Sequence, residues 1–334
     1  MIVDALDDID ELPAPRLAGD GPLARLPHLD FARLADARHD IGPAAHARWL
    51  DRRLARDGAL LLRGAPVAAP DDLERILATL IPAAEFLGYE EDRVAPRTRL
   101  GAHVYTSSEF RASLNIPLHN ERSPRNAWPM RIIFHCRTPA ARGGRTPIAD
   151  IRQVTAALPR DLVAEFAARG LRYVRNVGTR DVSLEFAFGT DDREAIDEYC
   201  VRHDLSIEWR DGDRARTTFL RPALATHPDT GELLWFNYVG TWTRRSWDRA
   251  HQVRLRATPD DELPYHTTFG DGGAIPDRTI DTILAAYAAA TVAFDWRAGD
   301  LLILDNMRWA HGREPYTGPR EVWTAMARLV QRTP

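Results

Sequence analysis

Short runs of β-forming residues, separated by turn-forming segments, recur along most of this 334-residue chain. Such runs cannot bury their apolar side chains alone, so we expect them to pair into two packed sheets or a closed barrel. The predicted strands cover residues 59–63, 131–136, 171–177, 206–209, 216–220, 233–237, 293–296, 301–305 and 321–330. The sequence therefore predicts a mainly β fold with flanking helices, built around an antiparallel double sheet or jelly roll.

Apolar residues at helical spacing predict helices beside these strands. The first begins at Pro43, and a second covers residues 73–80. Residues 1–42 carry Pro, Gly and Asp without sustained periodicity, which indicates a loosely packed amino-terminal arm. No linker or repeat divides residues 43–334, so we expect a single domain there. Further helices are predicted at 155–169, 191–203 and 277–290.

Charge and apolar patterning argue against several classes of partner. The formal net charge is -4, whereas nucleic acids and anionic membranes call for a basic surface. No apolar run reaches the roughly 18 residues of a membrane-spanning helix, and the amino-terminal segment lacks a signal-peptide pattern. We expect a cytoplasmic protein that acts on a small molecule, as a monomer or a homo-oligomer.

The two cysteines, Cys136 and Cys200, lack metal or redox spacing and are expected to stay reduced.

Two histidines and one glutamate form the candidate metal site. His119 and Glu121 are two residues apart, so in an extended segment both side chains project from the same face. His311 follows the predicted strand at 301–305 and can reach the same ion from a second strand. Two imidazoles and one carboxylate that leave coordination positions open are typical of non-haem Fe(II) oxygenases.

Two other interpretations fit these residues. The same ligands suit a catalytic zinc ion with an open position for water, as in a zinc hydrolase, although the helical His-Glu-x-x-His pattern is absent. In a non-catalytic jelly-roll binding protein, His119 and His311 would only contribute to packing. Either enzyme would bind a divalent metal, whereas the non-catalytic jelly-roll protein would fail to retain one. Consumption of dioxygen separates the oxygenase from the hydrolase.

Motifs around the candidate site carry a resemblance to a known family. They lie at residues 96–100, 104–108, 116–121, 143–147, 235–237, 296–313 and 318–320. With these motifs the chain resembles the Fe(II)/2-oxoglutarate-dependent oxygenases of the taurine dioxygenase (TauD/TfdA) type. The branch it resembles includes clavaminate synthase and the syringomycin-pathway aspartyl hydroxylase. The resemblance implies a cupin-like double-stranded β-helix core, Fe(II) bound by His119, Glu121 and His311, and 2-oxoglutarate and dioxygen as cosubstrates.

The resemblance also implies which residues hold 2-oxoglutarate. Thr146 and Arg320 would bind its distal carboxylate through a hydroxyl group and a bidentate guanidinium group. Arg320 follows His311 more closely than the corresponding arginine does in many relatives, so Arg328 is its rival. Related halogenases lack the carboxylate ligand. The presence of Glu121 therefore argues against halogenation.

The implied reaction is hydroxylation of an aliphatic C–H bond, with 2-oxoglutarate converted to succinate and carbon dioxide. We expect the substrate to be an amino acid or an amino-acid-derived intermediate of specialised metabolism, either free or attached to a carrier protein. Desaturation, cyclisation and oxidative decarboxylation are alternative outcomes at the same iron site. The candidate substrate contacts are Asn115, Asn237 and Arg313, and the candidate carrier contacts are Arg244, Arg245 and Arg249.

Overall fold

The computed structural model describes residues 26–36, 43–88, 97–179, 182–247 and 249–332. Within these ranges the largest sheet has six strands in the order β1-β2-β15-β5-β18-β3. Neighbouring strands in it run antiparallel, except that β1 and β2 are parallel. The strands are β1 (His28–Asp30), β2 (Ala59–Arg63), β15 (Asp300–Asp305), β5 (Ala127–Thr138), β18 (Glu321–Gln331) and β3 (Tyr105–Thr106).

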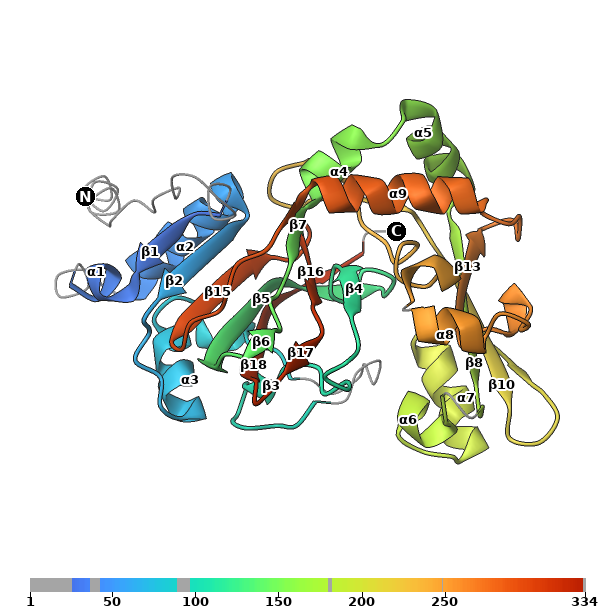
Figure 1. The fold of residues 1–334 in the computed structure, drawn as a ribbon, viewed down its shortest axis with the longest axis horizontal. Helices are drawn as coiled ribbons and strands as arrows, with labels where there is room; N and C mark the ends of the chain where they lie inside the picture. Colours follow the sequence, from blue (N-terminus) through green and yellow to red (C-terminus); the bar gives the residue numbers. More distant parts are fainter. Residues whose placement is uncertain (1–25, 37–42, 89–96, 180–181, 248, 333–334) are drawn as a thin grey trace.

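Helices from the amino-terminal region cover one face of this sheet (Figure 1). Because side chains alternate along a strand, Leu301 and Ile303 of β15 point to this face, whereas Leu302 and Leu304 point to the other. Trp49 packs in the same apolar cluster as Leu301. The covering helices are α1 (Phe31–Asp36), α2 (Pro43–Asp57) and α3 (Pro70–Ala78), followed by the short 3-10 helix η3 (Ala83–Glu85).

A four-stranded sheet with the order β14-β7-β16-β4 packs on the other face. Ile148 and Trp309 from this smaller sheet share an apolar cluster with Leu302 and Leu304. Two sheets packed in this way confirm the predicted jelly roll. The strands are β14 (Thr291–Val292), β7 (Ile148–Asp150), β16 (Trp309–Arg313) and β4 (Ile116–His119), and a short pair, β6 (Arg142–Gly143) and β17 (Tyr316–Thr317), lies outside the sheet.

A third sheet, of order β13-β8-β10-β9, lies at the end of the molecule away from β1 (Figure 1). Its Tyr173 and Phe219 share an apolar cluster with Met130 and Ala149 of the jelly roll, so one core joins the two parts. The strands are β13 (Tyr265–Phe269), β8 (Leu171–Val177), β10 (Ala215–Arg221) and β9 (Ser206–Trp209), with a separate pair, β11 (Leu224–Thr226) and β12 (Leu233–Trp235).

Helices surround this third sheet and connect it to the jelly roll. In Figure 1, α4 and α9 run across the top of the molecule between the two parts. Ile280 and Ile283 of α9 belong to the joining core. The helices are α4 (Ile151–Ala157), α5 (Arg160–Arg169), α6 (Leu184–Phe188), α7 (Arg193–Arg202), α8 (Arg249–Arg254) and α9 (Asp277–Ala289), with 3-10 helices η4 (Arg244–Ser246) and η5 (Asp260–Glu262).

Three sequence expectations need correction. The described part of the predicted arm is not loosely packed, because residues 26–36 form β1 and α1 and bury Leu26, Leu29 and Phe31. The strand predicted at 293–296 is wrong: regular pairing ends at β14, and the aromatic residues after it fill the core without strand hydrogen bonds. The single helix predicted at 155–169 is two helices, because Pro159 cannot continue α4 and instead begins α5.

Two further expectations concern membranes and cysteines. Among the helices of the described residues, none has both the length and the apolar character needed to cross a bilayer. Cys136 and Cys200 are both buried and form no disulfide, as the sequence predicts.

Candidate metal centre

The strands β4 and β16 bring the predicted metal ligands together. His119 ends β4 and is the antiparallel register partner of His311 in β16. The register shifts immediately after His311, where Gly312 passes close to β4. A Cβ atom on Gly312 would lie 2.6 Å from the carbonyl oxygen of Ile116. Glycine therefore permits the close approach that places His311 opposite His119.

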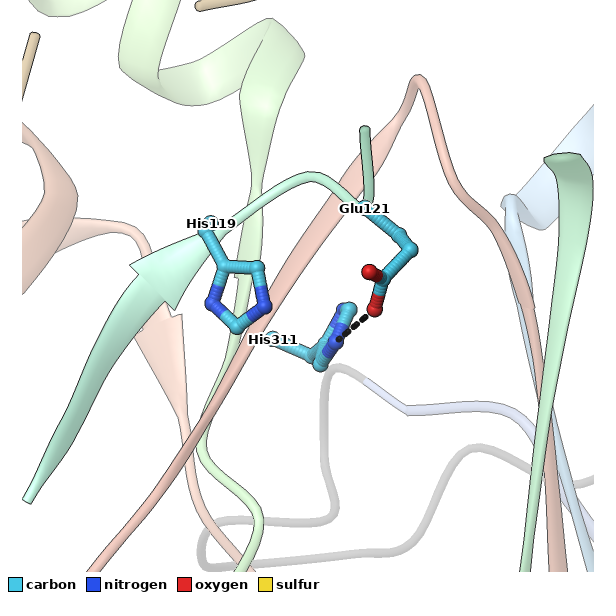
Figure 2. Close-up of side chains that lie close together, drawn as sticks. All are labelled: His119, Glu121 and His311. Atoms are coloured by element: carbon cyan, nitrogen blue, oxygen red, sulfur yellow. Dashed lines mark ion pairs between the residues drawn. The ribbon is translucent and has the colours of Figure 1, made fainter. Parts of the chain in front are cut away.

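The three predicted ligands converge on one point (Figure 2). One ligand atom from each of His119, Glu121 and His311 lies within 4.8 Å of the others. The Nε2 atom of His311 is 3.8 Å from Oε2 of Glu121, and the two imidazole ring centroids are 4.4 Å apart. In the described residues this is the only group of three or more His, Cys, Asp or Glu side chains so arranged.

Neighbouring groups hold the two rings in place. Nδ1 of His119 lies 2.8 Å from the carbonyl oxygen of Pro117, and an N–H donated there leaves Nε2 with a free lone pair. Phe134, from the facing sheet, packs against His311 with ring centroids 5.0 Å apart. The candidate centre therefore lies between the two sheets of the jelly roll.

Asn306, at the end of β15, holds the backbone around Glu121. Its Oδ1 accepts a 2.7 Å hydrogen bond from the Glu121 N–H, and its Nδ2 donates to the Glu121 carbonyl at 2.9 Å. The same amide nitrogen donates to Pro129, and Asn120 donates to the carbonyl of Asn306. Asn306 is fully buried, so these bonds are made away from water. This network positions Glu121 without contacting its carboxylate.

The charge states suit a divalent cation. Burial lowers the pKa of His119 and lowers that of His311 well below its usual value, so both imidazoles are neutral at pH 7. Burial opposes ionisation of Glu121, but the positive charges of Arg97 and Arg122 hold the pKa of this carboxyl below its usual value. Neutral imidazoles and an ionised carboxylate are the forms that bind metals. The donor set therefore fits an octahedral transition metal with open positions.

A small cavity of about 30 Å³ lies beside His119 and His311 and is lined by Thr146 and Arg320. Arg320 Nε donates to the carbonyl of Gly144 at 2.9 Å, and its Nη2 lies 3.4 Å from Thr146 Oγ1. Burial, followed by repulsion from Arg313, lowers the pKa of Arg320 to about 10, so the guanidinium remains charged at pH 7. Among the described residues, no carboxylate forms an ion pair with it.

Arg328, the alternative candidate for binding the distal carboxylate of 2-oxoglutarate, lies outside the small cavity. Both Nη atoms of Arg328 bond the carboxylate of Asp229 at 2.6 Å, and neither residue lines the small cavity. The surroundings of Arg320 therefore suit an anionic ligand better than those of Arg328.

A larger cavity of about 420 Å³ is lined by His119 and Glu121. Asn115, the first of the predicted substrate contacts, is exposed and lines it. Most of the exposed wall is apolar, and Phe186 and Trp242 contribute to it. The arrangement gives a ligand direct access to the candidate metal centre from a largely apolar space.

The other two predicted substrate contacts need correction. Asn237 is buried and bonds the backbone of Ala223 and Val239, and it does not line the large cavity. Arg313 uses its two Nη atoms to donate to the carbonyls of Ser108, Phe110, Arg111 and Leu114. Its guanidinium therefore holds the loop that precedes β4 and has no Nη hydrogen left for a substrate carboxylate.

Sequence reasoning assigned no role to two residues that contact Glu121. Arg97 Nη2 donates to Glu121 Oε2 at 2.9 Å, and Asn306 holds the Glu121 backbone. Both lie in motifs that carry the family resemblance, which is the one signal in the sequence that points to them.

A family model described as "Taurine catabolism dioxygenase TauD, TfdA family" matches residues 34–326. The chain belongs to the TauD/TfdA family. Membership confirms the predicted Fe(II)/2-oxoglutarate-dependent dioxygenase class and its cofactors, and it decides against the zinc hydrolase and the binding protein.

Relatives of this TauD/TfdA dioxygenase include the "Dapdiamide synthesis protein DdaC" of Enterobacter agglomerans. The two are 34% identical over 302 residues, which is 90% of this chain and 91% of DdaC. The "Clavaminate synthase-like protein At3g21360" of Arabidopsis thaliana is 28% identical over 297 residues, 84% of each chain. The crystal structure of PvcB from Pseudomonas aeruginosa aligns over 97% of this chain and 95% of its own, with a TM-score of 0.53 and 16% identity. That likeness supports the fold alone.

Proposed function

We propose that this dioxygenase hydroxylates an aliphatic C–H bond of a small amino acid or amino-acid-derived molecule. In the proposal, His119, Glu121 and His311 bind Fe(II), while Thr146 and Arg320 bind the distal carboxylate of 2-oxoglutarate. The observation that carries it is the convergence of the three ligands at two cavities, one lined by the half-buried Arg320 and one with a largely apolar wall. A cosubstrate in one cavity and a substrate in the other can then reach the same ion.

When bound, Fe(II) and 2-oxoglutarate supply the activation of dioxygen, with release of succinate and carbon dioxide. The protein supplies orientation and exclusion of water. Arg97 and Asn306 fix the carboxylate and the backbone of Glu121, and Phe134 restricts the ring of His311. Trp242 and its apolar neighbours in the large cavity exclude water from the substrate side. Such a rigid arrangement favours oxidation of one chosen C–H bond.

Hydroxylation is the proposed outcome, with desaturation, cyclisation and oxidative decarboxylation as its alternatives. The choice among them depends on the placement of the substrate relative to the metal. Mass spectrometry of the product separates hydroxylation from the alternatives, because a hydroxylated product gains one oxygen atom, whereas a desaturated or cyclised product loses two hydrogen atoms and a decarboxylated product loses carbon dioxide.

The contacts of two arginines support a free substrate in preference to a carrier-bound one. Arg244 pairs with Asp260 at 2.9 Å, and Arg245 pairs with the carboxylate of Asp281. The side chain of Arg249 lies outside the described residues. Arginines already paired with carboxylates contribute less binding free energy to an acidic carrier protein.

The name of DdaC, which refers to dapdiamide synthesis, supports a role in specialised metabolism.

Anaerobic titration of the metal-free protein with Fe(II) and 2-oxoglutarate tests the proposed site. We expect a visible charge-transfer band from the iron chelate, which is lost in His119→Ala and kept in a His203→Ala control. His203 caps α7 and lines neither cavity. A band of equal strength in both variants would contradict the ligand assignment.

A further inference from the structure

The segment between β3 and β4, residues 107–115, contributes to the wall of the large cavity and is called the wall loop below. Phe110 and Leu114 on this loop line the large cavity. Ser108 lines both the large cavity and the small one, as does His119. The wall loop therefore borders the space proposed for the substrate and reaches the space proposed for 2-oxoglutarate.

Little apolar packing holds the wall loop in place. Neither Phe110 nor Leu114 belongs to any of the four apolar clusters that the described residues form. Both side chains are only partly buried, and every second residue of the loop from Glu109 to Asn115 is exposed. A segment with so few buried apolar contacts opens easily unless other interactions fix it.

The guanidinium of Arg313 supplies these interactions. Its Nη1 donates to the carbonyls of Ser108 and Phe110, both at 3.0 Å. Its Nη2 donates to the carbonyls of Arg111 and Leu114 at 2.7 Å and 3.1 Å. Arg313 is only 4% exposed, so water competes little for these charge-assisted hydrogen bonds. One planar group therefore holds the backbone along most of the wall loop.

Tyr316 adds a second attachment close to Arg313. The N–H of Tyr316 donates to the carbonyl of Ala112 at 2.9 Å. Cζ of Arg313 lies 5.3 Å from the centroid of the Tyr316 ring, a cation–π contact that restrains the guanidinium. Arg313 and His311 both belong to β16, and both line the small cavity. The wall loop is thus attached to the strand that carries one of the proposed metal ligands.

We propose that Arg313 is a positioning residue that fixes the wall loop, and that Phe110 and Leu114 on this loop select substrates with an apolar portion. This inference rests on the proposed function and narrows its substrate class to small molecules with such a portion. Because the loop is bonded to β16, its two apolar side chains keep a fixed position relative to His311. A substrate that packs against them is then held in one orientation relative to the metal. A substrate without an apolar portion leaves them exposed to water and binds less tightly.

Amide hydrogen exchange tests whether Arg313 holds the wall loop. The N–H groups of Leu114 and Tyr316 donate to carbonyls of this loop, so their exchange rates report on its opening. In Arg313→Gln we expect both amides to exchange about tenfold or more faster than in the unaltered protein. The matched control is Arg99→Gln, because Arg99 also donates to backbone carbonyls but lines neither cavity. Equal exchange rates in the two variants would overturn the role of Arg313.

The dye N-phenylnaphthylamine tests the apolar wall, because it is neutral and its fluorescence rises in apolar surroundings. Titration of the metal-free protein measures its affinity without any need for turnover. We expect Phe110→Ala combined with Leu114→Ala to weaken dye binding about tenfold or more, since the truncations remove apolar contact area. The control is Leu233→Ala, because Leu233 is exposed in β12 and lines neither cavity. A double variant that binds the dye like the control would overturn the assignment of the wall.

Combined variants separate positioning from a general structural role. If Arg313 acts through the wall loop, Arg313→Gln alone should weaken dye binding. Added to Phe110→Ala and Leu114→Ala, it should then cause no further loss, because the side chains that it positions are already gone. Independent losses that multiply in the triple variant would overturn the link between Arg313 and the wall. If Arg313→Gln fails to fold, the double variant still tests the wall, because it leaves the guanidinium in place.

The iron chelate band separates this inference from the proposed function. Phe110 and Leu114 do not line the small cavity, so their double variant should form the band at the same Fe(II) and 2-oxoglutarate concentrations as the unaltered protein. Weakened dye binding with an intact band then belongs to the wall, whereas loss of the band in this variant would overturn the assignment. If the unaltered protein forms no band, the proposed function itself is contradicted, whatever the exchange and dye results.

Discussion

The guanidinium of Arg97 donates a 2.9 Å hydrogen bond to Oε2 of Glu121, and the side chains are only 4% and 11% exposed. A carboxylate held in this way cannot rotate freely, so its oxygens face His119 and His311 in a fixed orientation. In water such a pair would contribute little, but at this depth the interaction is stronger and the cost of breaking it larger. Arg97 is therefore a positioning residue for the proposed metal ligand.

Substitution of Arg97 should weaken metal binding. We expect Arg97→Gln to lower the affinity for Fe(II) by about 10-fold to 100-fold, the range typical when an outer-sphere partner of a metal ligand is lost. Anaerobic metal titration, followed by the chelate band, measures the change. Arg99→Gln is the matched control, because Arg99 bonds only the backbone of Gly101 and Ala102 on the surface. Equal affinities in the two variants would show that Arg97 does not position the ligand.

Loss of the Asn306 amide should destabilise the whole domain. Asn306→Ala leaves the Glu121 N–H and two buried carbonyl groups without their partner. Each unsatisfied buried group costs about 1–3 kcal/mol, so we expect a loss of at least about 2 kcal/mol in the free energy of unfolding. Urea denaturation measures it, with Asn126→Ala as the exposed control. A loss no larger than in the control would contradict the role of this network.

The candidate metal ligands could be predicted from the sequence for simple reasons. His119 and Glu121 have the i, i+2 spacing that shares one face of an extended segment, and His311 follows a continuous apolar run. The jelly roll could be predicted because many short strands leave few other ways to bury their side chains.

The partners of these ligands could not be predicted, because their contacts depend on how distant strands are aligned. Asn306 reaches Glu121 across 185 residues, through the pairing of β15 with β5. Asn237 and Arg313 are polar residues within the motifs, and the sequence cannot tell whether such groups face a ligand or the backbone. In the structure, nearby carbonyl groups accept from the side-chain nitrogens of both.

Stability at acid pH should depend on His135. This histidine is fully buried in β5 beside Trp323, away from the candidate metal centre, and burial lowers its pKa to about 4. The unfolded chain takes up a proton near pH 6.5 and the folded protein only near pH 4, so protonation favours unfolding as the pH falls through this window.

Replacing His135 should therefore make stability less sensitive to acid. Between pH 7 and pH 4 we expect His135→Phe to lose less unfolding free energy than the unaltered protein, by on the order of 3 kcal/mol. Denaturant unfolding at several pH values measures both curves. If they stay parallel across this range, His135 does not contribute to the acid sensitivity.

Substitution of Arg320 should weaken the use of 2-oxoglutarate without removing the metal. Arg320 lines the small cavity beside His119 and His311, whereas Arg328 is paired with Asp229. Loss of two charge-assisted hydrogen bonds of about 1.5–3 kcal/mol each predicts that Arg320→Gln needs at least about 100-fold more 2-oxoglutarate to form the chelate band. Arg328→Gln should need no more than the unaltered protein. The reverse order would identify Arg328 as the anchor instead, and equal losses in both variants would point to general destabilisation of β18 and its preceding turn.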